Sequence, residues 1–183
     1  MMQSYVIYGA GGFCKVILDL ILAVGGKVEC IFDDFPEKSN YSLMGIKVVK
    51  YDRNIFPDAQ LIIAIGNNEV RQALSKSLTH QFATIIHPTA SVSTFASIGK
   101  GSMILANAIV QAEAILGVHV IVNPGVCIDH EVHIGDFVHI GALVYIGGAA
   151  KVGELSNIRP GALVKRSMIL PDHSYINPNE IIQ

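Results

Sequence analysis

The chain has 183 residues, of which 51% are hydrophobic and 15% are charged, and its formal net charge at pH 7 is −2. This length fits one large domain or two small ones, and the charge balance argues against nucleic acid as a partner. No apolar run reaches the roughly 18 residues that a membrane span needs, so we expect no membrane insertion.

The N-terminus and the cysteines indicate a cytoplasmic protein. The opening sequence MMQSYVIYGAGG enters a strand-like run without the basic segment or cleavage site of a secretory signal. The three cysteines, Cys14, Cys30 and Cys127, are an odd number without CxxC spacing. A disulfide framework and a zinc ribbon are therefore disfavoured, and a reducing compartment is the natural interpretation.

The N-terminal part of the chain alternates between strand-like and helix-like segments. Strand-like runs cover residues 4–8, 27–32 and 59–65, and helical runs follow the first and third, over residues 16–26 and around 70–78. This βαβ-type order predicts a small open parallel sheet with helices on its faces, which is a Rossmann-like domain over residues 1–82. Ligands of such sheets bind at the carboxyl edge of the strands.

Three polar clusters follow the predicted strands at that edge: GAGGFCK after the first, Asp33-Asp34 after the second and Gly66-Asn67 after the third. A glycine loop lets the backbone approach a phosphate at a helix N-terminus. As a dinucleotide fingerprint it is imperfect, because Cys14 stands where the third glycine would be. The two aspartates would suit a nicotinamide ribose, a sugar amine or hydroxyl, or simply a solvated turn.

Two further residues of this region have more than one interpretation. Arg71 could pair with a phosphate, or it could form a salt bridge on the helix surface. Cys14 begins the predicted helix, where a thiol can have a lowered pKa, or it could pack against the sheet.

From Ile86 onward the chain carries an aliphatic residue at every sixth position. The 17 positions are Ile86, Val92, Ile98, Ile104, Val110, Leu116, Val122, Ile128, Ile134, Ile140, Ile146, Val152, Ile158, Val164, Leu170, Ile176 and Ile182. A series of smaller residues, mostly Ala and Val, lies two residues before these positions.

A period of six fits neither an α-helix, with about 3.6 residues per turn, nor a flat sheet, with a period of two. It suits a coil of short strands and turns, in which three hexapeptides make one triangular turn. Stacking such coils buries the aliphatic column. The repeat therefore predicts a parallel β-helix over residues 83–183.

The order of the two parts resembles the sialic acid O-acetyltransferase family of hexapeptide-repeat acyltransferases. Within it, the chain is most similar to the enzymes that N-acetylate UDP-linked 4-amino-sugars in the bacillosamine pathway. The matching segments are YGAGGFCK, IFDDF, IAIGNNEVR, IIHPTA and VNPGVCIDHEVHIGDFVHIGA. The resemblance implies a left-handed β-helix, acetyl-CoA as co-substrate, no metal, and a homotrimer with active sites between neighbouring β-helices.

The resemblance also implies roles for individual residues. His130 would be the general base, and Glu131 would support its basicity. His139 and the backbone N–H of Gly148 would hold the acetyl group of the coenzyme. The contacts to the nucleotide-linked amino-sugar would be Gly11, Gly12, Phe13, Asp33, Asp34, Gly66, Asn67 and Asn123.

The spacing of the repeat agrees with one of these roles. Gly148 follows His130 by three hexapeptides, so the two should lie in adjacent coils at the same point of the prism. Acyl transfer needs such a pair, because a base takes the proton of the nucleophile while a donor stabilises the developing oxyanion. A histidine with an ordinary pKa can act as a base near neutral pH.

Other interpretations of the same residues stay open. His130 could be a surface histidine, and His133 and His139, which share a repeat position, could stack as a surface column. The HEVH motif at residues 130–133 could also bind zinc, as in a hydratase of the carbonic-anhydrase type. Two further alternatives are O-acetylation of sialic acid or another sugar, and a non-catalytic scaffold that senses a nucleotide.

Overall fold

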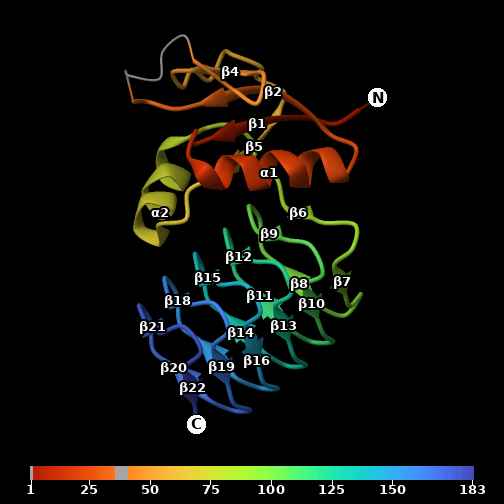
Figure 1. Ribbon diagram of the computed structural model, residues 1–183, viewed down its shortest axis with the longest axis vertical. Coiled ribbons are helices and arrows are strands. Elements are labelled where there is room, and N and C mark those ends of the chain that lie inside the picture. Colours follow the sequence, from red (N-terminus) through yellow and green to blue (C-terminus); the bar gives the residue numbers. More distant parts are fainter. Residues whose placement is uncertain (1, 36–40) are drawn as a thin grey trace. The chain divides into compact units, whose positions relative to one another are not determined.

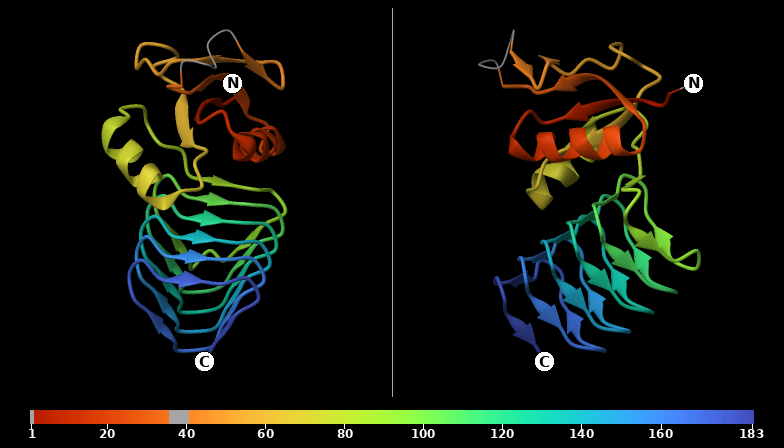
Figure 2. Two further views of the ribbon diagram at one scale, coloured as in Figure 1. Left: turned by 60° about the vertical axis from the view of Figure 1, so that its left-hand side comes forward. Right: turned by 45° about the vertical axis from the view of Figure 1, so that its right-hand side comes forward.

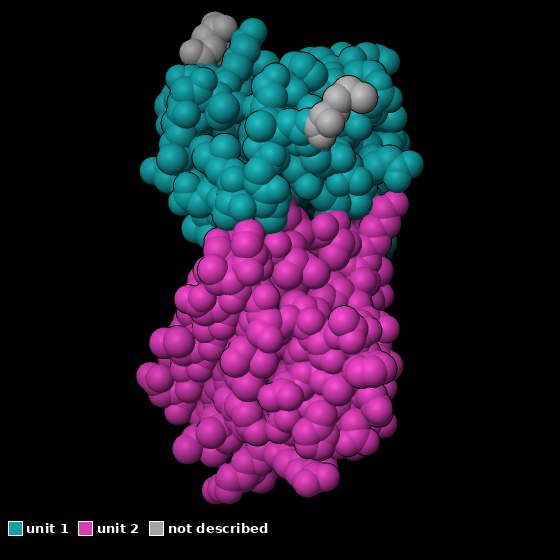
Figure 3. Space-filling view, turned by 90° about the vertical axis from the view of Figure 1, so that its right-hand side faces the viewer, with its two compact units in different colours: residues 1–83 teal, residues 84–183 magenta. Residues whose placement is uncertain are grey.

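The computed structural model describes residues 2–35 and 41–183 and divides the chain into two compact units. Unit 1 is Met1–Ala83 and unit 2 is Thr84–Gln183, coloured separately in Figure 3. Neither helix in the described part of the chain is long and apolar enough to cross a membrane.

Unit 1 is a small mixed α/β domain, as the sequence predicts (Figure 1). In its described part the strand order is β3-β4-β2-β1-β5, with β3 antiparallel to β4 and the other pairs parallel. The strands are β1 (Ser4–Tyr8), β2 (Lys27–Phe32), β3 (Ser42–Leu43), β4 (Ile46–Val49) and β5 (Gln60–Ile63). The helices are α1 (Gly12–Ala23) and α2 (Asn68–Ser77). The sequence patterns did not predict β3 and β4.

Helix α1 begins four residues earlier than the apolar pattern predicts, because the glycine segment forms its first turn. Gly11 is its N-cap, and the backbone N–H of Cys14 donates to the Gly11 carbonyl over 3.1 Å. The buried face of the helix is Cys14, Ile17, Leu18, Leu20 and Ile21. Cys14 is fully buried, so its packing role is confirmed.

Unit 2 is a β-helix of two-residue strands (Figure 2). The β6 sheet contains β6 (Ile85–Ile86), β9 (Met103–Ile104), β12 (Ile121–Val122), β15 (His139–Ile140), β18 (Asn157–Ile158) and β21 (Tyr175–Ile176). The β7 sheet contains β7 (Ser91–Val92), β10 (Ile109–Val110), β13 (Cys127–Ile128), β16 (Tyr145–Ile146), β19 (Leu163–Val164) and β22 (Ile181–Ile182). The β8 sheet contains β8 (Ser97–Ile98), β11 (Ile115–Leu116), β14 (His133–Ile134), β17 (Lys151–Val152) and β20 (Ile169–Leu170).

Parallel pairing between every third strand confirms the triangular coil. Cys127 pairs with Tyr145, and Ile128 pairs with Ile146, three hexapeptides further along the chain. From β7 onward the second residue of each strand belongs to the aliphatic column and packs in the prism, whereas the first lies on the opposite face of its strand. The column is buried through most of its length, but Ile86 in the first coil is 38% exposed and is not core.

Candidate active site

His130 and Glu131 lie in the turn that connects β13 to β14. The Nδ1 atom of His130 is 2.8 Å from Oε2 of Glu131. Glu131 has a φ of 61°, in the left-handed region that this position of the turn requires, and its carboxylate reaches back to the preceding imidazole. A carboxylate can only accept at Nδ1–H, so it leaves Nε2 as the nitrogen that can take up a proton. The His130 side chain is 43% exposed, so this nitrogen is accessible.

Asp129 adds a second carboxylate beside the same imidazole. Its Oδ1 accepts the backbone N–H of His130 over 2.7 Å and lies 3.9 Å from Nε2 of that residue. Its Oδ2 accepts the hydroxyl of Tyr145 over 2.9 Å. The His130 N–H above all holds the pKa of Asp129 below its ordinary value, with smaller contributions from the Tyr145 hydroxyl, the charge of His130 and the Gly148 N–H.

Gly148 lies against His130 in the next coil, as the repeat spacing predicts. The backbone N–H of Ala149 donates to the carbonyl of His130 over 3.0 Å and holds the two turns together. A Cβ atom placed on Gly148 would lie 2.9 Å from both Cε1 and Nε2 of His130. The absence of a side chain at Gly148 is therefore what makes room for the imidazole.

Asn123 and His139 form a second group. The Nδ2 atom of Asn123 lies 2.9 Å from Nε2 of His139 and also donates to the carbonyl of Ile140 over 2.7 Å. An amide N–H can only donate, so Nε2 of His139 is the acceptor and its Nδ1 carries the proton. This contact fixes the tautomer of His139 and the orientation of its ring.

The two groups lie on different sides of one prism. His139 is on β15 in the β6 sheet, whereas His130 lies in the turn between the β7 and β8 sheets. Their separation along the chain is half of one coil. One chain therefore does not bring His139 to His130.

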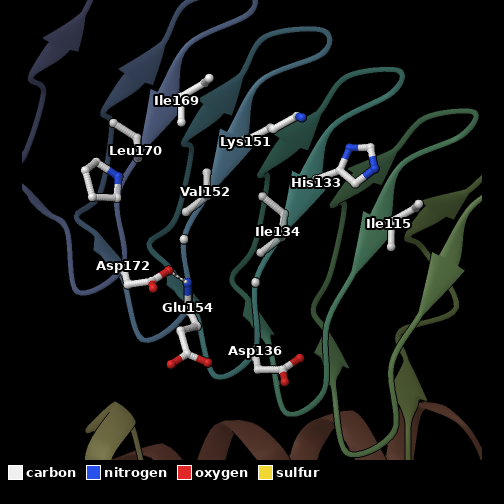
Figure 4. A pocket seen from close by; sticks show the side chains of 13 residues that line it. Ile115, His133, Ile134, Asp136, Lys151, Val152, Glu154, Ile169, Leu170 and Asp172 are labelled. Carbon is white, nitrogen blue, oxygen red and sulfur yellow. Dashed lines mark hydrogen bonds between the residues drawn. The ribbon is translucent and has the colours of Figure 1, made fainter.

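The expected stacking of His133 with His139 is wrong. His133 pairs with Ile115 and Lys151 in the β8 sheet, and His139 pairs with Ile121 and Asn157 in the β6 sheet. Residues stack when they are one full coil apart, and these two are only one hexapeptide apart. His133 instead borders a shallow depression of about 760 Å³ on the β8 sheet, with the exposed side chains of Ile115 and Ile169 (Figure 4).

The polar clusters of unit 1 gather where the strand order predicts, after the adjacent strands β2, β1 and β5. The buried Asp33 accepts the backbone N–H of Ala10 through Oδ2 over 2.8 Å and that of Phe35 through Oδ1 over 3.1 Å. Asp33 thus fixes the glycine segment. Asp34 is exposed, and its Oδ2 accepts the hydroxyl of Tyr8 over 2.7 Å.

A cavity of about 270 Å³ lies at this edge of the sheet. Its lining is Tyr8, Gly9, Asp33, Asp34, Phe35, Ile65, Val70 and Leu74. Gly9 has a φ of 105°, and a Cβ there would lie 2.6 Å from Cδ1 of Ile65, so this position requires glycine. Gly11 and Gly12 face open space, and Asn67 caps α2 by accepting the backbone N–H of Val70 over 2.9 Å.

Arg71 has neither of the roles that the sequence suggested. Its side chain is fully buried, and Nη1 donates to the carbonyls of Ile65 and Gly66 while Nη2 donates to Oδ1 of Asn68. Burial lowers the pKa of its guanidinium to about 10. Arg71 therefore secures the loop between β5 and α2 from inside. Val70, in the first turn of α2, is 46% exposed.

The residues that the structure describes contain no group of three or more His, Cys, Asp or Glu side chains placed to hold a metal ion.

The chain combines a small α/β unit with a β-helix that carries a histidine–carboxylate pair at one turn. Residues 5–78 match the family described as the PglD N-terminal domain, and residues 131–166 match the bacterial transferase hexapeptide family (six repeats). The chain is thus similar in its first part to PglD-type N-terminal domains and in its second part to hexapeptide-repeat transferases.

A relative of known activity is similar to part of this chain. It is 37% identical over 113 residues to UDP-N-acetylbacillosamine N-acetyltransferase of Bacillus subtilis (strain 168). That alignment covers 57% of this chain and only about half, 52%, of the relative.

Solved structures match over the whole chain. One is a histidine mutant of GDP-perosamine N-acetyltransferase from Caulobacter crescentus, in complex with CoA and GDP-perosamine. It is 25% identical to this chain, with a TM-score of 0.83, and the match covers 100% of this chain and 92% of that one. The acetyltransferase domain of PglB from Neisseria gonorrhoeae FA1090, in complex with acetyl coenzyme A, is 28% identical with a TM-score of 0.69, covering 96% of each chain.

Proposed function

We propose that this protein is an acetyl-CoA-dependent N-acetyltransferase that acts on a nucleotide-linked amino-sugar. The observation that carries the proposal is the imidazole of His130, which is hydrogen-bonded through Nδ1 to Glu131 and lies against the side-chain-free Gly148. Two of the relatives named above are, by name, N-acetyltransferases of UDP-N-acetylbacillosamine or GDP-perosamine. The two matched structures hold CoA or acetyl-CoA.

In the proposed reaction the sugar amine attacks the carbonyl carbon of the thioester. Nε2 of His130 takes a proton from the amine as the C–N bond forms, and the carboxylate of Glu131 stabilises the resulting imidazolium through Nδ1–H. The tetrahedral oxyanion faces the Gly148 N–H and His139. It collapses with cleavage of the C–S bond, and coenzyme A leaves as the thiol after receiving the proton from His130.

We assign the nucleotide end of the acceptor to unit 1. The cavity beside Asp34 and Tyr8 lies at the carboxyl edge of a parallel sheet, where such ligands bind. Gly11, Gly12 and Phe13 form the first turn of α1, whose backbone N–H groups suit a phosphate. Asp33 positions this turn through Ala10, and Gly66 and Asn67 border the same edge from β5.

The proposed enzyme is a homotrimer whose sites form between subunits. His139 and Asn123 lie half a coil away from His130, so a complete acetyl site needs the His130 turn of one subunit and the β6 sheet of its neighbour. Exposed apolar side chains outside the prism, among them Ile115, Leu143 and Ile169, offer surface for such contacts. Light scattering should give about three times 19.7 kDa.

The proposal includes a cytoplasmic location. In the described part of the chain Cys14, Cys30 and Cys127 form no disulfide, which suits a reducing compartment.

The test is a thioester-consumption assay over UDP-, GDP- and dTDP-linked amino-sugars, with free sialic acid as the O-acetylation alternative. We expect turnover with one class of nucleotide-linked amino-sugar and none with sialic acid. Bound zinc with CO₂ hydration would support the hydratase instead. Thermal stabilisation by a nucleotide-sugar but not by acetyl-CoA, without turnover, would support the non-catalytic scaffold.

A further inference from the structure

The positive charges of the β-helix are concentrated in one coil. Unit 2 contains five lysines and arginines, and none lies between Lys100 and Lys151. The other four are Lys151, Arg159, Lys165 and Arg166. All four fall within the length of one coil. This cationic coil, residues 151–166, directly follows Gly148 in the chain. The positive charge therefore lies on the C-terminal side of the site.

The two arginines of this coil continue the two halves of the proposed site. Arg166 lies two coils beyond His130, with Gly148 between them. Arg159 lies two coils beyond Asn123, with Gly141 between them. Each half therefore repeats one order along the prism: a polar site residue, a glycine and an arginine.

Backbone hydrogen bonds hold both series in this register. Ala149 N–H donates to His130 over 3.0 Å, and Ser167 N–H donates to Gly148 over 2.9 Å. In the other series Asn123 N–H donates to Ile140 over 3.1 Å, and Gly141 N–H donates to Ile158 over 2.7 Å. Two steps between parallel strands are about 10 Å. The middle residue is glycine in both series, so it contributes no side chain of its own between the site residue and the arginine.

Within the described residues, neither arginine has a carboxylate partner. Arg166 is exposed and has no hydrogen bond or ion pair from its side chain there. Arg159 is half-buried, and its Nε is a buried donor without a hydrogen-bond partner in that part of the chain. A buried N–H without a partner is costly, and the single chain leaves this guanidinium without the acceptor it needs.

We propose that Arg159 and Arg166 bind the diphosphate of coenzyme A. The inference rests on the proposed function, in which the His130 turn of one subunit meets the Asn123 side of its neighbour. Arg166 then comes from the first subunit and Arg159 from the second. A guanidinium pairs with phosphate through parallel charge-assisted hydrogen bonds, which is the partner these unpaired cations suit. The acceptor also carries a diphosphate, but unit 1 already offers the α1 N-terminus for it.

The test compares coenzyme A with pantetheine, which lacks all phosphates, by calorimetry on the whole protein. Arg159→Gln and Arg166→Gln should each weaken CoA binding about 10- to 100-fold, the range for a charge-assisted hydrogen bond, and leave pantetheine binding unchanged. Lys151→Gln is the matched control, because Lys151 belongs to the same coil but points outward from the β8 sheet. Its CoA affinity should equal that of the wild type.

Kinetics distinguish the two sources of diphosphate. The arginine variants should raise the KM for acetyl-CoA and leave the KM for acetyl-pantetheine and for the amino-sugar nucleotide unchanged. A rise in the amino-sugar KM alone would overturn the assignment to coenzyme A, as would wild-type CoA affinity in both variants. Failure of the wild-type protein to bind CoA at all would instead refute the proposed function.

Discussion

The imidazole of His130 occupies the space that a side chain at position 148 would take. A Cβ on Gly148 would lie 2.9 Å from two atoms of the ring, well inside contact distance. Gly148 is absent from the residues with positive φ, so alanine there meets no backbone strain. The glycine is therefore required for the position of the histidine and not for the shape of the turn.

Gly148→Ala should displace the imidazole and leave the fold intact. We expect kcat to fall about 10- to 100-fold, the size of effect that a misplacement of about 1 Å can produce, with the melting temperature nearly unchanged. Steady-state kinetics and thermal unfolding measure the two effects. In a His130→Ala background the same substitution should cost nothing further, since no ring remains to be displaced. Wild-type turnover in the single variant would contradict the contact.

Asp33 and Asp34 should respond differently to the same substitution. Asp33→Asn weakens the contacts to Ala10 and Phe35 inside unit 1 and should lower stability by about 1–3 kcal/mol. Asp34→Asn should raise the KM for the amino-sugar nucleotide and leave the KM for acetyl-CoA unchanged. Its loss of stability should be smaller than that of Asp33→Asn, because the contacts of Asp34 to Tyr8 and Tyr51 are made by an exposed carboxylate. Micromolar binding of NADH that Asp34→Asn abolishes would show a dinucleotide site instead.

The six-residue period predicted the β-helix well because the coil is a repeat in which every turn has the same buried residue. Once Ile128 and Ile146 are assigned to one column, the pairing of their neighbours follows. Unit 1 was harder, since the short strands β3 and β4 bury few residues and have no clear alternation. Arg71 shows another limit, because a buried cation that binds backbone carbonyls resembles a surface residue in the sequence.

The same period also limited what could be predicted of the site. It placed Gly148 beside His130, and it could have placed Tyr145 beside Asp129, because Tyr145 is one full coil after Cys127. The half-coil separation of His139 from His130 already implied opposite sides of the prism. The structural role of Asp33 had no such signal, since its contacts depend on how the glycine segment turns into α1.

Two inactive variants should restore activity when their subunits mix. His130→Ala lacks the base and His139→Ala lacks the second histidine, so neither homotrimer should turn over. In coexpressed random trimers, about a quarter of the intersubunit sites combine an intact His130 turn with an intact His139. We therefore expect about a quarter of wild-type activity in the purified mixture. As a control, the two variants carry different tags, and both must be produced in equal amounts and be equally well folded.

Mixing that restores no activity would show that both histidines act within one subunit or that one of them has no role. A stable monomer with full activity would refute both the trimer and the shared site.

The most direct measurement is the mass of the product formed by the wild type, His130→Ala and His133→Ala from acetyl-CoA and nucleotide-linked amino-sugars. The wild type should add one acetyl group to the sugar amine. His130→Ala should lower kcat by roughly 10²–10⁴, the range for loss of a general base. His133→Ala, on the β8 sheet, should differ little from the wild type. Acetylation at a normal rate by His130→Ala, or no acetylated product from any acceptor with the wild type, would contradict the account.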